Sequence, residues 1–137
     1  MNLKLSALAG ILLLAVLLSG CTSQTATNSG LNTETAKAAI KIIDANGNEI
    51  FGKTIDFAKG SNGLNVLENS GLQVEAKTYV GMGSMVTGIN GITADSEHYW
   101  ALYVNGAYAD KAIDAYILNS DTAIELRLEK IDFSKLS

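Results

Sequence analysis

The sequence predicts an α+β domain in which a small, mostly antiparallel sheet carries one helix packed across it. Three observations lead to this prediction. Several segments alternate apolar and polar residues with the period of two that is typical of half-buried strands. Asn-Gly pairs, which favour tight hairpin turns, separate some of these segments. Only residues 61–71 combine a polar capping residue, a helical apolar side and a terminal glycine.

The first twenty residues have the pattern of a secretion signal. Lys4 supplies the positive charge, and Leu5 to Leu18 form an apolar segment shorter than a membrane span requires. The sequence Leu18-Ser19-Gly20-Cys21 resembles a lipobox, which implies cleavage before Cys21 and a diacylglycerol thioether on its sulfur. Because Cys21 is the only cysteine, lipid attachment also explains a lone thiol in an exported protein. We expect an exported lipoprotein held on the extracytoplasmic face of a membrane. An ordinary signal peptide (residues 1–20) with an incidental cysteine is the alternative.

A polar, aperiodic segment follows the expected lipid anchor. Residues 21–37 are rich in Thr, Ser and Asn, which is typical of a flexible tether, so the single folded domain is expected at residues 38–137. The formal net charge is −4, from 10 basic and 14 acidic residues. Loss of Lys4 with the signal leaves 9 basic residues and a charge of −5. This balance disfavours nucleic acid as a partner.

The domain is expected to begin with a hairpin. Residues 40–43 form its first strand, Asn46-Gly47 has the composition of a type I′ turn, and residues 49–57 return. The return strand places three apolar side chains on one face: Phe51, Ile55 and Phe57.

A short helix is expected next, capped by Ser61 or Asn62 and ended by Gly71. A helix of about ten residues is marginal in isolation and must therefore dock on the sheet. Residues 73–80 alternate again as a strand, and residues 81–85, with two glycines and two methionines, predict a flexible apolar loop.

Residues 99–108 predict a second hairpin and hold the only tryptophan and three of the five tyrosines. Asn105-Gly106 supplies a second type I′ turn. The face expected in the core carries Trp100, Leu102 and Val104, and the opposite face carries Tyr99, Ala101 and Tyr103.

The chain then crosses back over residues 111–119 and ends in the most regular strand, residues 123–130. Its inward residues are expected to be Ile124, Leu126 and Leu128, and its outward residues Glu125, Arg127 and Glu129.

Four motifs occur in a characteristic order: Asn65-Val66-Leu67-Glu68-Asn69-Ser70-Gly71-Leu72, Gly88-Ile89-Asn90-Gly91-Ile92, Tyr99-Trp100 followed by Tyr103-Val104-Asn105-Gly106, and Tyr116-Ile117-Leu118 leading to Asp121. This ordered set, spanning residues 38–130, resembles the β-grasp-type domain found at the C-terminus of transcobalamin and intrinsic factor and alone in many prokaryotic surface proteins. Ser120 departs from the pattern, since a glycine usually precedes the acidic residue. In the vitamin carriers this domain is one half of a clamp around cobalamin. The resemblance therefore implies cobalamin or a related tetrapyrrole as a candidate ligand.

The sequence contains no catalytic constellation. It lacks the Gly-x-Ser-x-Gly and HExxH motifs, so we expect no enzyme. A single imidazole, His98, could ligate a metal ion, but it lies beside Asp95 and Glu97 with no second His or Cys to complete a site. We therefore predict no metal centre.

Aromatic and methionine residues have the best claim to a function. Tyr99, Tyr103 and Tyr108 could line one strip of the hairpin and stack on a flat ligand, and Met82 and Met85 would add adaptable contacts. This predicts a binding module for a corrinoid or a similar flat molecule. The alternative is a cell-envelope protein–protein interaction domain, in which the same surface or an exposed strand edge accepts a partner. The tyrosines could instead cover a second apolar layer or lie on an open sheet face.

Overall fold

The computed structural model describes residues 32–136. The predicted signal peptide, the lipid attachment at Cys21 and most of the predicted tether lie outside these residues. The elements, in chain order, are β1 (Thr35–Ile43), β2 (Glu49–Ala58), β3 (Ser61–Asn62), α1 (Gly63–Glu68), β4 (Val74–Tyr79), β5 (Gly83–Ile89), β6 (Ile92–Thr93), β7 (His98–Val104), β8 (Ala107–Tyr108), the 3-10 helix η3 (Ile113–Ala115), β9 (Ile117–Leu118), β10 (Thr122–Lys130) and the 3-10 helix η4 (Phe133–Leu136).

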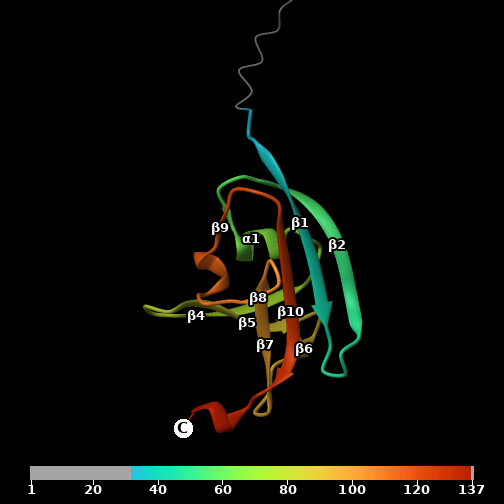
Figure 1. The fold of residues 1–137 in the computed structure, drawn as a ribbon, viewed down its shortest axis with the longest axis vertical. Helices are drawn as coiled ribbons and strands as arrows, with labels where there is room; N and C mark the ends of the chain where they lie inside the picture. Colours follow the sequence, from blue (N-terminus) through green and yellow to red (C-terminus); the bar gives the residue numbers. More distant parts are fainter. Residues whose placement is uncertain (1–31, 137) are drawn as a thin grey trace, which may run out of the picture. The chain divides into compact units, whose positions relative to one another are not determined.

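A five-stranded sheet with the order β2-β1-β10-β7-β8 forms one layer (Figure 1). Its first and last long strands, β1 and β10, run parallel, and the other neighbours in this sheet are antiparallel. A three-stranded sheet, β4-β5-β6, and the short pair β3-β9 complete the strands.

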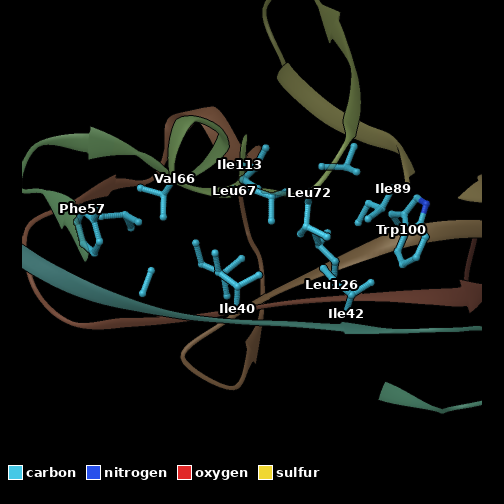
Figure 2. Close-up of a cluster of buried hydrophobic side chains, with 14 of the residues drawn as sticks. Ile40, Ile42, Phe57, Val66, Leu67, Leu72, Ile89, Trp100, Ile113 and Leu126 are labelled. Carbon is cyan, nitrogen blue, oxygen red and sulfur yellow. The ribbon is translucent and has the colours of Figure 1, made fainter. Parts of the chain in front are cut away.

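The core lies between one face of the large sheet and a mixed layer above it. Inward side chains of the sheet are Ala38, Ile40, Ile42, Ile124 and Leu126, all buried. Figure 2 shows Val66 and Leu67 of α1, Ile113 of η3 and Ile89 of β5 on the opposite side of this core. The buried apolar side chains that the structure describes fall between Ala36 and Leu126, so residues 32–136 contain their own core.

The prediction of a sheet-rich domain is confirmed, but the cover of the sheet is not one helix lying across it. Helix α1 has six residues rather than about ten, and its buried residues are Gly63, Val66 and Leu67. Asn62 is its N-cap and accepts the N–H of Asn65 through its side chain at 2.9 Å. A helix this short covers only part of the inner face of the sheet. Strand β5 and η3 contribute further buried side chains over the same face.

The predicted aromatic hairpin and its turn are confirmed, but the predicted faces hold only in part: Ala101, expected on the face opposite the core, is 1% exposed, and Val104, expected in the core, is half-buried and outside the core cluster. Asn105 and Gly106 have φ values of 52° and 83°, as a type I′ turn requires. Trp100 and Leu102 pair with Leu128 and Leu126 on the core side of the sheet.

The turn at residues 44–48 differs from the prediction. Gly47 has a positive φ of 86° but Asn46 does not, so this is not a type I′ turn. Asp44 holds it instead, because its side chain accepts the N–H groups of Asn46 and Asn48, both at 2.8 Å.

The predicted flexible loop at residues 81–85 is wrong. Strand β5 already begins at Gly83, so Met85 lies in a strand and only the turn around Met82 is outside one. Strand β1 likewise begins at Thr35, within the segment assigned to the tether, and buries Ala36.

Truncating Trp100 should test the assignment of faces. Its side chain is 4% exposed and its indole N–H donates to the carbonyl of Ile92 at 3.1 Å. Trp100→Ala should therefore lower the free energy of unfolding by about 3–5 kcal/mol in urea titrations. Tyr103→Ala, on the opposite face, should cost clearly less. Equal losses would show that both faces of the sheet contribute equally to the core.

Candidate ligand-binding pocket

A pocket of about 470 Å³ opens beside strand β7. Four parts of the chain enclose it: the turn and start of β5, strand β7 from Tyr99 to Leu102, the segment from β8 to η3, and Leu126 of β10. Its lining residues are Met82, Ser84, Met85, Val86, Tyr99, Trp100, Leu102, Tyr108, Ala109, Asp110, Lys111, Ala112, Ile113, Ala115 and Leu126. Most of these side chains are apolar or aromatic, as in small-molecule sites generally.

Close packing of the start of β5 against Ala112 and η3 fixes one wall. The N–H of Ser84 donates to the Asp114 carboxylate at 2.9 Å, and this bond lowers the pKa of that carboxyl. A Cβ atom on Gly83 would lie 2.6 Å from the Cβ of Ala112 and 2.7 Å from the Asp114 carboxylate. Any side chain at this position would force Ala112 or Asp114 to shift, so glycine fits this approach best.

Tyr116 holds the other end of this segment, at Asp110 and Lys111. Its hydroxyl donates to the Asp110 carboxylate at 2.9 Å and accepts the N–H of Asp110 at 3.1 Å. The Lys111 ammonium lies 4.7 Å from the centre of the same ring. Burial, reinforced by the hydrogen bond to Asp110, raises the pKa of Tyr116.

Tyrosines on the outer face of β7 and β8 form a cluster of their own. The rings of Tyr103 and Tyr108 meet edge to face with centroids 5.6 Å apart, and the hydroxyl oxygens of Tyr99 and Tyr108 lie 3.5 Å apart. Tyr103 donates to the Glu129 carboxylate at 2.6 Å, and the Arg127 guanidinium lies 4.2 Å from its ring centre. The bond to Glu129 raises the pKa of Tyr103, and the contact with Tyr108 raises that of Tyr99.

Four of the five site residues predicted from the sequence line the pocket, and one does not. Tyr99, Tyr108, Met82 and Met85 all line the pocket. Tyr103 does not, since it contacts Glu129 and Arg127 on the outer face of the sheet.

Sequence reasoning missed the wall formed by residues 109–115. Three alanines in that segment, Ala109, Ala112 and Ala115, line the pocket, and their small side chains leave its volume open. Small residues placed around a buried anchor, Ile113, are the signal that could have identified this wall.

His98 lies at the start of β7, with its Nδ1 atom 3.1 Å from the Asp95 carboxylate. Within residues 32–136, no group of three or more His, Cys, Asp or Glu side chains is arranged to hold a metal ion. No helix in this part of the chain is long and apolar enough to span a membrane.

Residues 60–130 match the family model described as a domain of unknown function, DUF4430. This match covers more than half of the chain. The chain belongs to the DUF4430 family. The matched residues include all those that line the pocket, and they extend from just before β3 to the end of β10. No curated protein matches the chain.

Two solved structures share the fold of this DUF4430 domain. Haptocorrin in complex with Cbi superposes with a TM-score of 0.60 at 18% identity, over 73% of this chain and 26% of haptocorrin. A protein of Ruminococcus gnavus ATCC 29149, provisionally named a metal binding protein, superposes with a TM-score of 0.59 at 20% identity, over 71% of this chain and 99% of that protein. With the family match, these likenesses confirm the predicted transcobalamin-like domain. At such identities they establish the fold alone.

Two glycines at the pocket rim allow a matched test of its wall. Gly81 and Gly83 have similar positive φ values, 79° and 91°, but only Gly83 is closely packed. Gly81→Ala should cost the backbone strain alone, and Gly83→Ala should cost about 1–3 kcal/mol more in urea unfolding because Ala112 and Asp114 must move. Equal costs would contradict the close approach of β5 to residues 112–114.

Proposed function

We propose that the chain is an extracytoplasmic, membrane-anchored binding module, without enzymatic activity, whose pocket beside β7 receives a flat and largely apolar ligand. A corrinoid is the first candidate. The observation that carries the proposal is the pocket itself, because it combines an aromatic floor with few polar groups.

The size and chemistry of the pocket support a small-molecule ligand. Its volume, about 470 Å³, lies within the range of roughly 300–1,000 Å³ that is usual for ligand sites. Tyr99 and Tyr108 offer ring surfaces, the buried Trp100 lies beneath them, and Met82 and Met85 offer adaptable thioethers at the rim. Asp110 and Lys111 supply one carboxylate and one ammonium that can orient polar substituents of a ligand.

The likeness to haptocorrin, solved in complex with Cbi, supports a corrinoid as the first ligand to test. This chain matches only 26% of haptocorrin, so a whole corrinoid would be held by one side here. A corrinoid is also larger than the pocket and would enter it by an edge. Binding should therefore be weak, with dissociation constants in the micromolar range or above, or about −8 kcal/mol at best.

A protein partner is the second candidate for this surface. The turn between β4 and β5 exposes Val80 fully (102%) and Met82 by 73%, and Tyr108 across the pocket is 59% exposed. Apolar side chains gathered at a rim are typical of contact surfaces. In this case the occupant of the pocket would be a side chain of another envelope protein.

Cobalamin titration of purified residues 32–137 tests the first candidate. Trp100 is the only tryptophan and lines the pocket, so its fluorescence, corrected for absorption by the ligand, should report occupancy. Tyr108→Ala should weaken binding roughly two- to tenfold, because it removes one stacking surface.

Tyr103→Phe is the matched control. It keeps the ring that contacts Tyr108 and lies outside the pocket lining, so cobalamin affinity should not change. Loss of affinity only in the Tyr103 variant would move the site to the outer face of the sheet. Absence of binding to cobalamin and to haem would favour the protein partner.

Lipid attachment needs a separate test, because Cys21 lies outside the described residues. In cells, Cys21→Ser should remove the acyl mass from the N-terminus and shift the protein out of the detergent phase. A Ser23→Ala variant, next to the same site, should behave like the unaltered protein. If the unaltered protein carries no added mass at Cys21, the lipoprotein proposal is wrong.

A further inference from the structure

Two tyrosines that line the pocket bring their hydroxyl groups together. Tyr99 lies in β7 and Tyr108 in β8, and their hydroxyl oxygens are 3.5 Å apart. Tyr108 pairs across the hairpin with Tyr103, which is four residues, roughly 13 Å, along β7 from Tyr99. Strand pairing alone therefore does not bring the two hydroxyls together. Both side chains lean along the hairpin toward each other, so that their oxygens converge beside the pocket.

The hydroxyl of Tyr108 has no close hydrogen-bond partner. Oxygen atoms in an O–H···O bond are usually about 2.7–2.8 Å apart, so the contact with Tyr99 is loose. By contrast, Tyr103 donates to Glu129 at 2.6 Å and Tyr116 donates to Asp110 at 2.9 Å. Within residues 32–136, the Tyr108 hydroxyl makes no other hydrogen bond, and its side chain is exposed. Its oxygen is therefore available to a bound ligand.

Tyr99 is the member of the pair that is suited to donate. The contact with Tyr108 is the largest cause that raises the pKa of Tyr99, and burial adds to it. Tyr99 therefore keeps its proton and can donate it toward the Tyr108 oxygen. A hydrogen bond donated to an ionised oxygen is stronger than one between neutral groups, so this arrangement stabilises a phenolate at Tyr108.

The remaining lining residues suit a flat ring that carries a hard metal ion and acidic substituents. A tyrosine oxygen is one of the side-chain ligands that hold haem iron. Met82 and Met85, from β5 and the turn before it, offer adaptable apolar contacts to the face of a porphyrin. Among the described residues that line the pocket, only Lys111 is a cation, and its ammonium can pair with a carboxylate of the porphyrin.

We propose that the pocket binds ferric haem, with the Tyr108 oxygen as an axial ligand of the iron and Tyr99 donating a hydrogen bond to that oxygen. The proposal rests on the proposed function, since the pocket must first receive a flat ligand, and it names an iron porphyrin as that ligand. The likeness to haptocorrin does not decide between the two ligands, because at 18% identity it establishes the fold alone.

Ligation exchanges one axial ligand for another. The water bound to the iron of free ferric haem leaves, the Tyr108 oxygen forms the bond to iron, and the phenol proton passes to solvent. Iron stays Fe(III) throughout, so the step needs no oxidant or reductant.

Paired titrations of purified residues 32–137 with ferric haem and with metal-free protoporphyrin IX test the proposal. The two ligands share the flat ring and its carboxylates and differ in the iron. Binding is followed by quenching of Trp100, which lies in the pocket, and by the visible spectrum. The unaltered protein should bind one haem per chain, at least about tenfold more tightly than protoporphyrin IX. The complex should show the charge-transfer band of a phenolate bound to Fe(III).

Tyrosine-to-phenylalanine variants separate ligation from stacking, because they remove a hydroxyl and keep the ring. Tyr108→Phe should abolish the band and weaken haem binding at least about tenfold, with less than about a twofold change for protoporphyrin IX. Tyr99→Phe should shift the band and cause a smaller loss, since the ligand remains. Tyr79→Phe is the matched control. Tyr79 is 38% exposed and lies outside the pocket lining, so this variant should bind both ligands like the unaltered protein.

The outcomes distinguish this proposal from the proposed function. Equal haem affinity in the unaltered protein and Tyr108→Phe overturns axial ligation, and so does a band lost only in Tyr99→Phe. Binding of protoporphyrin IX or cobalamin without a preference for haem also overturns it and leaves the proposed function standing. Absence of haem binding overturns it as well, and the cobalamin titration then decides the proposed function separately. Unchanged midpoints in urea unfolding confirm that each variant is folded.

Discussion

The parallel pairing of β1 with β10 is the contact on which the rest of the domain depends. It joins the first and last long strands of the described chain, with Ala38 opposite Thr122 and Ile42 opposite Leu126. Strand β2 attaches to one side of this pair, and β7 with β8 attaches to the other. Because β1 and β10 come from opposite ends of the described domain, the core closes only when the whole domain has folded. The pairing also separates the two edges of the sheet, so that one can bound a pocket while the other stays free.

The pocket exists because the connection between β8 and β9 and the start of strand β5 come together beside β7. The chain leaves β8 through Ala109 to Ala112, and Tyr116 fixes this segment by its two hydrogen bonds to Asp110. From the other side β5 approaches so closely that a side chain at position 83 would force Ala112 or Asp114 to shift. Buried Ile113 holds the two walls to the core, and the alanines around it leave room for a guest. The aromatic side chains of β7 then form the floor. The site is therefore rigid in its backbone and adaptable at its methionine rim.

Local patterns in the sequence predict much of this fold. The turn at Asn105-Gly106, the alternation from Ile124 to Leu128 and the burial of Trp100 follow from backbone preferences and periodicity, and the structure agrees. The parallel direction of β10 could not be inferred, because alternation is the same in parallel and antiparallel strands. The length of α1 was overestimated because tertiary contacts, not its own residues, determine how much of the segment is helical.

The site was harder to predict than the fold. Tyr99 and Tyr108 line the pocket, whereas Tyr103 is engaged with Glu129 and Arg127. Position along the hairpin does not distinguish them, since all three share the outer face of the sheet. The wall at residues 109–115 carries no binding motif, and its only signal in the sequence is the set of small residues around Ile113.

Mapping cobalamin on residues 32–137 by ¹H–¹⁵N chemical-shift perturbation tests most directly that this pocket is the binding site. Ligand should shift the amides of residues 82–86 and 109–115 and the indole N–H of Trp100, with little change at Lys37, Ala39 or Thr54 on the uncovered face of the sheet. Shifts confined to that uncovered face, with the pocket amides unmoved at saturating cobalamin, would contradict the account.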